Sequence, residues 1–373
     1  MKITAKITAA EQEVVTLIDS GLTQSQVAEK LGINASNVSR RLSGAKHKAL
    51  REGMAPGFEI DRKTEGRWYT DESGDRRVEY LKSKREKESK NNIADAFRAA
   101  ISDTKPIKSI AIPKANLTDI MTVYPMGDPH VGLYAYHKES GEDFDCDIAE
   151  RDLLAATDYL VDIAPATEEA LIVNLGDFFH GDSGKNTTTA GTPVDIDTRW
   201  SRVLQIGIKI MIRLTEKALS KHKRVTVIVA PGNHDSESSI VLTIAMQIYF
   251  EKNKRVTIQE PNMFHFYEFG ANLIGVCHGH TVKKEALPGL MAEDMPEAWG
   301  RTKHRYWYTG HIHHRTLLEV GSSIIESFRT LAGKDAWHHG QGYRAGRDMN
   351  AIVLHKKYGE TDRHRCDILR ARA

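Results

Sequence analysis

Five short segments of the chain combine glycine with histidine, aspartate or asparagine. They are GDPH at 127–130, GDFFHGD at 176–182, PGNHD at 231–235, HGH at 278–280 and GHIHH at 310–314. Imidazole, carboxylate and neutral amide oxygen together suit Mn, Fe or Zn better than Ca or a thiolate-bound metal. A single histidine is more often a surface or core residue, but five such segments in succession predict a metal site.

Each segment follows a short apolar run that is typical of a buried strand, such as RVTVIV before PGNHD. Residues 147–163, 198–221 and 237–253 read as intervening helices. This alternation predicts an α/β fold with an at least partly parallel sheet. The carboxyl ends of such strands form the ligand crevice. The candidate metal ligands at those ends are Asp128, His130, Asp177, Asn233, His278, His311 and His313.

In this order the five segments resemble the motifs of calcineurin-like metallophosphoesterases, over about residues 120–355. The resemblance implies a two-sheet α/β sandwich with the motif loops along one edge. It also implies two divalent ions, with manganese expected first and iron or zinc as alternatives. A hydroxide bridging the two metals would attack phosphorus. The resemblance assigns one metal to Asp128, His130, Asp177 and His313, and the other to Asp177, Asn233, His278 and His311.

The same resemblance suggests catalytic roles for three further residues. His234 would stabilise the transition state and protonate the leaving oxygen, while Asp235 would hold its imidazole in the useful tautomer. GDFFH also resembles the GDxFH motif of the SbcD-type DNA-repair nucleases, in which the histidine helps to place the nucleotide. His180 inherits that role as a hypothesis, and a rim histidine without substrate contact is the alternative.

The substrate class is suggested by residues that the motifs lack. The protein serine/threonine phosphatase branch carries arginine in GDxxDRG and RGNHE, where it binds a dianionic monoester. The corresponding segments here, 176–182 and 231–235, have none. We therefore expect a dimetal phosphodiester hydrolase, a DNA exonuclease or endonuclease. A phosphatase or nucleotide phosphoesterase is the alternative, with the N-terminal region used for protein assembly. A DNA-binding regulator with an inactive metal domain is disfavoured by the complete ligand set.

Residues 21–50 predict two short helices joined by a glycine turn. Thr23 and Gln26 form a capping-box pattern, Gly32 ends the first helix, and Asn34 or Ser36 can cap the second. With a helix over 11–20, the segment resembles bacterial and phage helix-turn-helix domains. A three-helix bundle that binds protein is the alternative. The expected DNA-contacting residues are Ser36, Asn37, Ser39, Arg40 and Arg41.

The sequence suggests three regions. Residues 1–52 form the small all-α helix-turn-helix domain, 53–118 a charged connector, and 119–373 the metallophosphoesterase domain. The connector contains a predicted hairpin that turns at 72–75, followed by a charged run at 79–92 that reads as exposed helix or linker. Residues 1–120 carry a net charge of +5 against −3 for the remainder, which weakly favours nucleic acid. One such motif binds DNA weakly, so a homodimer or a second DNA contact is expected.

Other features bound the setting of the protein. The three cysteines are widely spaced, and neither a signal peptide nor an 18-residue apolar run is visible, which favours a cytoplasmic protein with no membrane association. The arrangement resembles short phage and prophage metallophosphoesterases, and nothing indicates a coiled-coil ATPase partner. The segment 334–350 either stacks on bases through Trp337 and Arg344 or forms a structural hairpin that seals the sheet edge.

Overall fold

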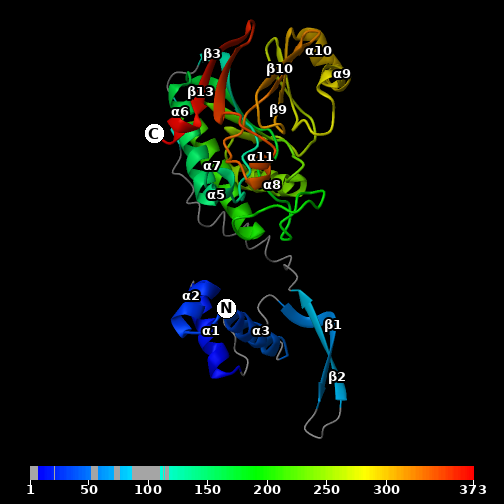
Figure 1. Ribbon diagram of the computed structural model, residues 1–373. Coiled ribbons are helices and arrows are strands. Elements are labelled where there is room, and N and C mark those ends of the chain that lie inside the picture. The colour runs from blue at the N-terminus through cyan, green and yellow to red at the C-terminus, as the bar shows by residue number, and fades with distance from the viewer. Residues whose placement is uncertain are drawn as a thin grey trace. The chain divides into compact units, whose positions relative to one another are not determined.

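The computed structural model describes residues 7–20, 22–51, 58–70, 76–85, 110–111, 113 and 117–373 (Figure 1). The chain divides into two compact units, Met1–Asn91 and Asn92–Ala373. The first unit contains the helices α1 (Ala9–Asp19), α2 (Gln24–Leu31) and α3 (Ala35–Arg51) and the strands β1 (Phe58–Thr70) and β2 (Arg76–Arg85).

The helix boundaries in the first unit follow the signals in the sequence. Thr23 and Gln26 form the predicted capping box at the start of α2. Gly32 ends this helix in the left-handed conformation, with φ of 63°. The Asn34 side chain accepts a hydrogen bond of 2.9 Å from the backbone N–H of Asn37. Asn34 rather than Ser36 therefore caps α3, because its short side chain reaches the exposed N–H groups of the first turn.

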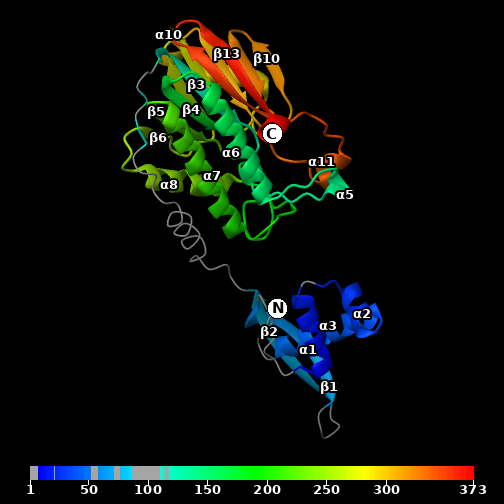
Figure 2. The same cartoon turned by 90° about the vertical axis from the view of Figure 1, so that its left-hand side faces the viewer.

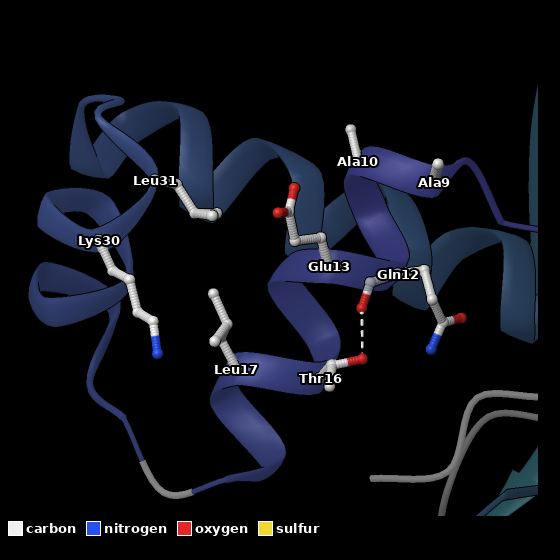
Figure 3. Close-up of a pocket in the computed structure, with 8 residues that line it drawn as sticks. All are labelled: Ala9, Ala10, Gln12, Glu13, Thr16, Leu17, Lys30 and Leu31. Carbon is white, nitrogen blue, oxygen red and sulfur yellow. Dashed lines mark hydrogen bonds between the residues drawn. The ribbon is translucent and has the colours of Figure 1, made fainter.

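The three helices share a small apolar core. Its fully buried members include Val14 of α1, Val27 of α2 and Val38 of α3. A shallow hollow lies on the surface beside Leu17 and Leu31, with Lys30 and Glu13 at its border (Figure 3). This hollow belongs to α1 and α2, whereas all the expected DNA-contacting residues lie on α3.

Strands β1 and β2 pair in antiparallel register, with an irregularity between Glu59 and Lys63. They lie in the stretch for which the sequence predicts a hairpin, but the expected turn at 72–75 is outside the described residues. The charged run that begins at Glu79 was expected to be helix or linker, and this expectation is wrong up to Arg85. Cross-strand pairing keeps those residues in β2, since a strand partner outweighs local propensity. The rest of the run is outside the described residues.

The second unit is built on two sheets. The six-stranded sheet has the order β13-β12-β3-β4-β5-β6, in which β3 to β6 are parallel. The five-stranded sheet has the order β10-β11-β9-β8-β7, in which β11, β9 and β8 are parallel. The strands are β3 (Leu117–Met126), β4 (Thr167–Asn174), β5 (Arg224–Val229), β6 (Val256–Ile258), β7 (His265–Phe269), β8 (Asn272–Val276), β9 (His304–Thr309), β10 (Thr316–Val320), β11 (Ser323–Ser327), β12 (Asp348–His355) and β13 (Gly359–Asp367).

Helices cover the outer faces of both sheets. Side chains of α6, α7 and α8 share a core with the six-stranded sheet, and α6 and α7 lie across that face in Figure 2. The helices α9 and α10 cover the five-stranded sheet. Leu287 and Met291 of α9 share a core with Trp307, which lies in strand β9. The described helices of this unit are α5 (His137–Ser140), α6 (Cys146–Ile163), α7 (Trp200–Lys221), α8 (Ser236–Phe250), the 3₁₀ segment η1 (Lys284–Ala286), α9 (Leu287–Asp294), α10 (Pro296–Arg301), α11 (Ala336–Gly340) and α12 (Ile368–Ala371).

The two sheets pack against each other through alternate strand residues. In β3, Met121 and Val123 face the five-stranded sheet, while Tyr124 and Met126 face the helices. Successive side chains of a strand point to opposite faces, so a strand buried on both sides reads as one continuous apolar run. The predicted two-sheet α/β sandwich is thus confirmed.

His222, which follows α7, is buried and has no acidic partner among the described residues. Its Nε2 lies 2.8 Å from the Tyr124 hydroxyl and its Nδ1 lies 2.7 Å from Thr167 Oγ1. Burial lowers the pKa of His222 from its usual 6.5 to about 3, and the positive charge of Lys221 adds to this effect. The native structure therefore keeps this imidazole neutral at pH values where the unfolded chain protonates it.

We expect part of the acid sensitivity of the fold to come from His222. Between pH 6.5 and about 3 the unfolded chain binds the additional proton, so stability is intact above this window and falls as the pH decreases through it. Urea unfolding at pH 7.5 and at pH 5 measures this effect in both proteins. Between these two pH values, the free energy of unfolding should fall by about 2 kcal/mol less in His222→Gln than in wild type. An identical loss in both proteins would contradict this assignment.

Two further sequence expectations concern the chain as a whole. Within the described residues, no helix combines the length and apolar character needed to cross a membrane. Cys146, Cys277 and Cys366 are buried and form no disulfide.

Candidate metal centre

The seven predicted ligands lie in loops that follow five strands from both sheets. Asp128 and His130 follow β3, Asp177 follows β4 and Asn233 follows β5, all in the six-stranded sheet. The remaining three come from the five-stranded sheet, with His278 after β8 and His311 and His313 after β9. The site is therefore assembled where the carboxyl ends of two packed sheets meet.

Asp128, His130 and His313 form the first cluster of potential ligand atoms. The Nε2 atoms of His130 and His313 are 3.0 Å apart, and His313 Nε2 is 3.6 Å from Asp128 Oδ1. Asp128 and His130 are almost fully buried. Burial lowers the pKa of His130 well below 6.5 and that of His313 to about 3. Both imidazoles are therefore neutral near pH 7, which is the form that binds metal ions.

Asp177, His278 and His311 form the second cluster. The Nε2 of His278 lies 3.0 Å from Asp177 Oδ2 and 3.0 Å from Asn233 Oδ1. On the other side of the ring, Nδ1 lies 2.8 Å from the Leu175 carbonyl and can donate its proton there. This hydrogen bond leaves Nε2 as the free ligand atom, the usual outer-shell arrangement around a metal-binding histidine.

The backbone is strained at five of the predicted ligands. Asp128, His130, Asp177, His311 and His313 adopt positive φ values between 45° and 71°. Residues other than glycine rarely occupy this region, and such strain persists only where the surroundings enforce it. Its concentration on the candidate ligands indicates that the loops are shaped to aim these side chains.

Two glycines allow the ligand loops to approach one another. A Cβ atom on Gly232 would lie 2.0 Å from Asp177 Oδ1, and one on Gly310 would lie 2.6 Å from Asp128 Oδ2. Only glycine fits at such distances. The turn at 231–232 therefore releases Asn233 and His234 directly beside the Asp177 carboxylate.

The site brings two buried carboxyl groups together, and their pKa values shift in opposite directions. Burial, together with the charge of Asp177, raises the pKa of Asp128 to about 8. Burial disfavours the charged form of Asp177 as well, but His278 holds its pKa below the usual value. The pKa of His278 rises to about 9 despite burial, because Asp177 and Asp128 favour the charged ring. Buried carboxylates with converging imidazole nitrogens and an amide oxygen fit divalent cations.

The comparisons with known proteins agree with this geometry. A model of the calcineurin-like phosphoesterase family matches residues 121–340. The chain belongs to this family. The family uses a dimetal centre, and both clusters of this phosphoesterase lie within the matched residues.

Several solved structures are similar to this phosphoesterase at low sequence identity. Zinc-complexed Vps29 of Entamoeba histolytica shares 14% identity, covering 66% of this chain and 99% of its own, with a TM-score of 0.28. The phosphoesterase YfcE of E. coli shares 15% identity, covering 65% and 98%, with a TM-score of 0.31. Vps29 of Cryptosporidium parvum shares 14%, covering 66% and 97%, with a TM-score of 0.32. No curated protein sequence matches the chain.

His234 lies beside both clusters of the phosphoesterase. Its ring centroid is 4.9 Å from that of His130, and its backbone N–H donates a 2.8 Å hydrogen bond to Asp177 Oδ1. The imidazole is oriented through Nδ1, which lies 2.9 Å from the His180 carbonyl oxygen. A proton on Nδ1 leaves Nε2 free to act on a substrate.

Asp235 does not orient His234, which corrects the expectation from the sequence. Its carboxylate accepts hydrogen bonds from the N–H groups of Phe179 (3.0 Å) and Gly232 (2.9 Å). Asp235 therefore ties the second motif loop to the third. Burial, and next the charge of Asp177, raise its pKa to about 7.

Asp182 has a structural function that sequence reasoning missed. Its carboxylate accepts hydrogen bonds from the N–H groups of Glu237 (3.0 Å) and Ser238 (2.7 Å) in the first turn of α8. Asp182 thus caps α8 in place of the preceding Asp235, whose side chain is turned inward. The two partners are far apart in sequence, so no local pattern announces this cap.

His180 is buried at 1% exposure and is not a rim residue. Its Nδ1 lies 3.1 Å from Nδ1 of His130, on the side of that ring away from His313. A proton on His130 Nδ1 would donate to His180 and keep Nε2 available for metal. The Nε2 of His180 has no hydrogen-bond partner among the described residues. This geometry supports a role for His180 in positioning the imidazole of the candidate ligand His130.

Removing His180 should weaken metal binding at the first cluster. Loss of such outer-shell partners typically costs 10–100-fold in metal affinity. Calorimetric Mn²⁺ titration of His180→Ala should show this loss, and His180→Asn should recover part of it by retaining an acceptor. The control is His314→Ala, since His314 follows ligand His313 but is exposed. Unchanged affinity in His180→Ala would contradict the positioning role.

Three more residues lie next to the candidate ligands in space or in sequence. Thr330 donates a 2.6 Å hydrogen bond to the backbone carbonyl of Asp128, and no sequence signal identifies it. The ring of His280 is 5.2 Å from that of His278, so His280 lies next to this candidate ligand. His314, which follows the candidate ligand His313, is exposed.

The expected DNA-contacting residues lie in the first unit, on α3. Ser36, Ser39 and Arg40 are exposed, and Asn37 and Arg41 are partly exposed. Arg40 Nη2 donates a 2.7 Å hydrogen bond to Asn37 Oδ1. These side chains form one polar, positively charged stretch near the start of the helix.

Proposed function

We propose that this phosphoesterase hydrolyses phosphodiester bonds and that its substrate is DNA. The observation that carries the proposal is the absence of arginine and lysine from 176–182 and 231–235, the two motif loops that wall the clusters. A dianionic monoester needs additional cationic donors, usually bidentate arginine. Two divalent ions beside Asp128 and Asp177 leave enough positive charge for a diester monoanion. The proposal places the protein near the SbcD-like nucleases.

In this proposal, one set of residues binds the metal ions and His234 acts on the substrate. Asp128, His130, Asp177 and His313 would hold one ion, and Asp177, Asn233, His278 and His311 the other. Bound ions, of which manganese is our first expectation, supply a nucleophile at neutral pH and stabilise charge at phosphorus. His234, aimed by the His180 carbonyl, would stabilise the transition state through Nε2 and pass a proton to the leaving oxygen.

The first unit would bring the enzyme to its substrate as a helix-turn-helix domain. Support comes from three short helices with α3 carrying Ser39, Arg40 and Arg41 on its surface. Arginine and polar side chains at such positions contact phosphates and base edges. A tethered domain raises the local concentration of DNA at the catalytic unit. A single copy would bind weakly, so we include a homodimer in the proposal.

The test is product formation from end-labelled linear DNA with purified protein and Mn²⁺. Parallel reactions contain a chromogenic phosphodiester and the matching monoester, and Asp177→Asn is the inactive control. Cleavage of DNA and the diester supports the proposal, and the product ladder separates exonuclease from endonuclease action. DNA cleavage should fall steeply with salt because counterion release drives binding. Monoester turnover with intact DNA would instead favour a phosphatase.

A further inference from the structure

A group of aromatic side chains lies directly beside the candidate metal centre and has no part in the mechanism above. The segment 334–350 does not form the hairpin considered from the sequence. It contains the short helix α11 and a loop, and its last three residues begin β12. In both views α11 lies at the end of the sandwich where α5 also lies (Figures 1 and 2).

The contact with the metal centre runs through His338. Its ring is stacked on that of ligand His313, with centroids 4.9 Å apart and planes inclined by 17°. Trp337 and Tyr343 contact the other sides of His338, with centroids 5.0 and 5.1 Å away. We call Trp337, His338 and Tyr343 the aromatic wall.

The aromatic wall is held in place by its own hydrogen bonds. Asp335 caps α11 by accepting a 2.8 Å hydrogen bond from the His338 N–H, and its carboxylate lies 2.7 Å from His338 Nδ1. The backbone N–H of Tyr343 donates to the His338 carbonyl at 3.0 Å. The rings are therefore fixed beside the site before any ligand arrives.

Trp337 is nevertheless exposed over 60% of its surface. Its ring centroid is 5.9 Å from that of Tyr343, with the two ring planes inclined by 40°. The exposed Arg344 adds positive charge there, since its guanidinium donates to the carbonyls of Tyr343 and His339 and pairs with no described carboxylate. Aromatic faces beside a cation are the features that bind unpaired bases and their backbone.

We propose that the aromatic wall binds the base of a nucleotide attached to the scissile phosphate, through stacking on Trp337. This inference rests on the proposed function and narrows it to diesters with an unpaired base next to the bond that is cut. In a nucleotide, one sugar separates the base from its phosphate. Trp337 and His313 are separated by a comparable distance, since one ring, that of His338, lies between them. Stacking tolerates any base, so the wall selects nucleotides without selecting sequence.

The experiment compares two substrates that share one scissile diester. The first is the dinucleotide thymidylyl-thymidine, and the second is its analogue in which both bases are replaced by hydrogen. Wild type should cleave the dinucleotide with a kcat/KM about 10-fold higher, since a stacked base contributes this order of affinity. Trp337→Ala should remove that preference mainly through KM, and Trp337→Phe should retain most of it.

Tyr358→Ala is the matched control, because Tyr358 is exposed to 62% and lies in the β12–β13 turn. That turn lies at the opposite end of the strands from the metal centre, since His355 pairs with Ile120 near the start of β3 and the candidate ligands follow the end of β3. This variant should cleave both substrates as wild type does. Equal loss on both substrates in Trp337→Ala, or no loss on either, would overturn the inference.

A binding measurement separates this inference from the proposed function. Thymidine 5′-monophosphate should quench tryptophan fluorescence in wild type, and Trp337→Phe should lose most of the quench. A protein that cleaves neither diester contradicts the proposed function, and the quench then still decides whether the wall binds a base. An unchanged quench in Trp337→Phe overturns the inference even if both diesters are cleaved.

Discussion

Asp177→Asn should abolish hydrolysis and at the same time make the metal-free protein less stable. Asp177 is the residue expected to bridge the two ions, and its Oδ2 lies 3.0 Å from His278 Nε2. The ions contribute several kcal/mol of transition-state stabilisation. Loss of about 4 kcal/mol corresponds to a fall of about 10³-fold in rate.

The loss of stability follows from the buried ion pair of Asp177 with His278, whose Nε2 lies 3.0 Å from Asp177 Oδ2. His278 holds the pKa of Asp177 below its usual value, so the ionised carboxylate stabilises the metal-free fold near pH 7. Asparagine has nearly the same shape and retains Oδ1, which accepts the His234 N–H at 2.8 Å. The substitution therefore keeps this contact but leaves the charged His278 without its ion-pair partner.

Thermal unfolding with and without Mn²⁺, beside rate measurements, checks both parts of this prediction. Wild type should gain stability as metal is added, because ligands that bind only the native state stabilise it by mass action. Asp177→Asn should start from a lower melting temperature and gain little when metal is added. A variant that retains metal-induced stabilisation and near-normal rates would show that Asp177 is not the bridging ligand.

His234→Ala should have the second largest effect, with metal binding intact and turnover reduced. His234 Nδ1 lies 2.9 Å from the His180 carbonyl oxygen. His234 belongs neither to the cluster that contains Asp128 nor to the cluster that contains Asp177. A positioned acid or base typically contributes 10²–10⁴-fold to rate. We therefore expect kcat for a phosphodiester to fall by about that factor.

Metal content and kcat measured on the same preparation test the role of His234. A substrate with a better leaving group should be less affected, since protonation of the leaving oxygen then matters less. His234→Gln, which cannot transfer a proton in this way, should resemble His234→Ala. Loss of metal from His234→Ala would assign His234 to the ligand shell instead, together with His130 and His180, whose ring nitrogens it approaches.

Local patterns in the sequence were sufficient to propose the candidate ligands and to predict the elements that carry them. A β-branched run such as 225–229 forms β5 because both faces of a parallel strand are buried, and the glycine after it permits the sharp turn that frees Asn233. The capping box of Thr23 and Gln26 is equally local, since its two residues contact each other. Such features depend on neighbours within a few positions, and the sequence contains all of them.

The orientation of the catalytic side chains was decided only by the tertiary structure. Asp235 was expected to hold His234, yet it bonds Phe179 and Gly232, and the His180 carbonyl holds His234 instead. His180 was expected to help place the nucleotide, with a rim position as the alternative, and the structure buries it against His130. Apart from the local Asp235–Gly232 contact, these contacts join residues that are 50 to 56 positions apart.

The aromatic wall depends on the same kind of closure. The sequence suggested base stacking by Trp337, but no local pattern connects Trp337 or Tyr343 with the metal centre. They lie beside it because His338 stacks on His313. Residue type and spacing determined which groups could bind metal, since those properties are local. Which group faces which was fixed by the packing of two sheets against each other, because that packing sets the distances between loops that no short pattern connects.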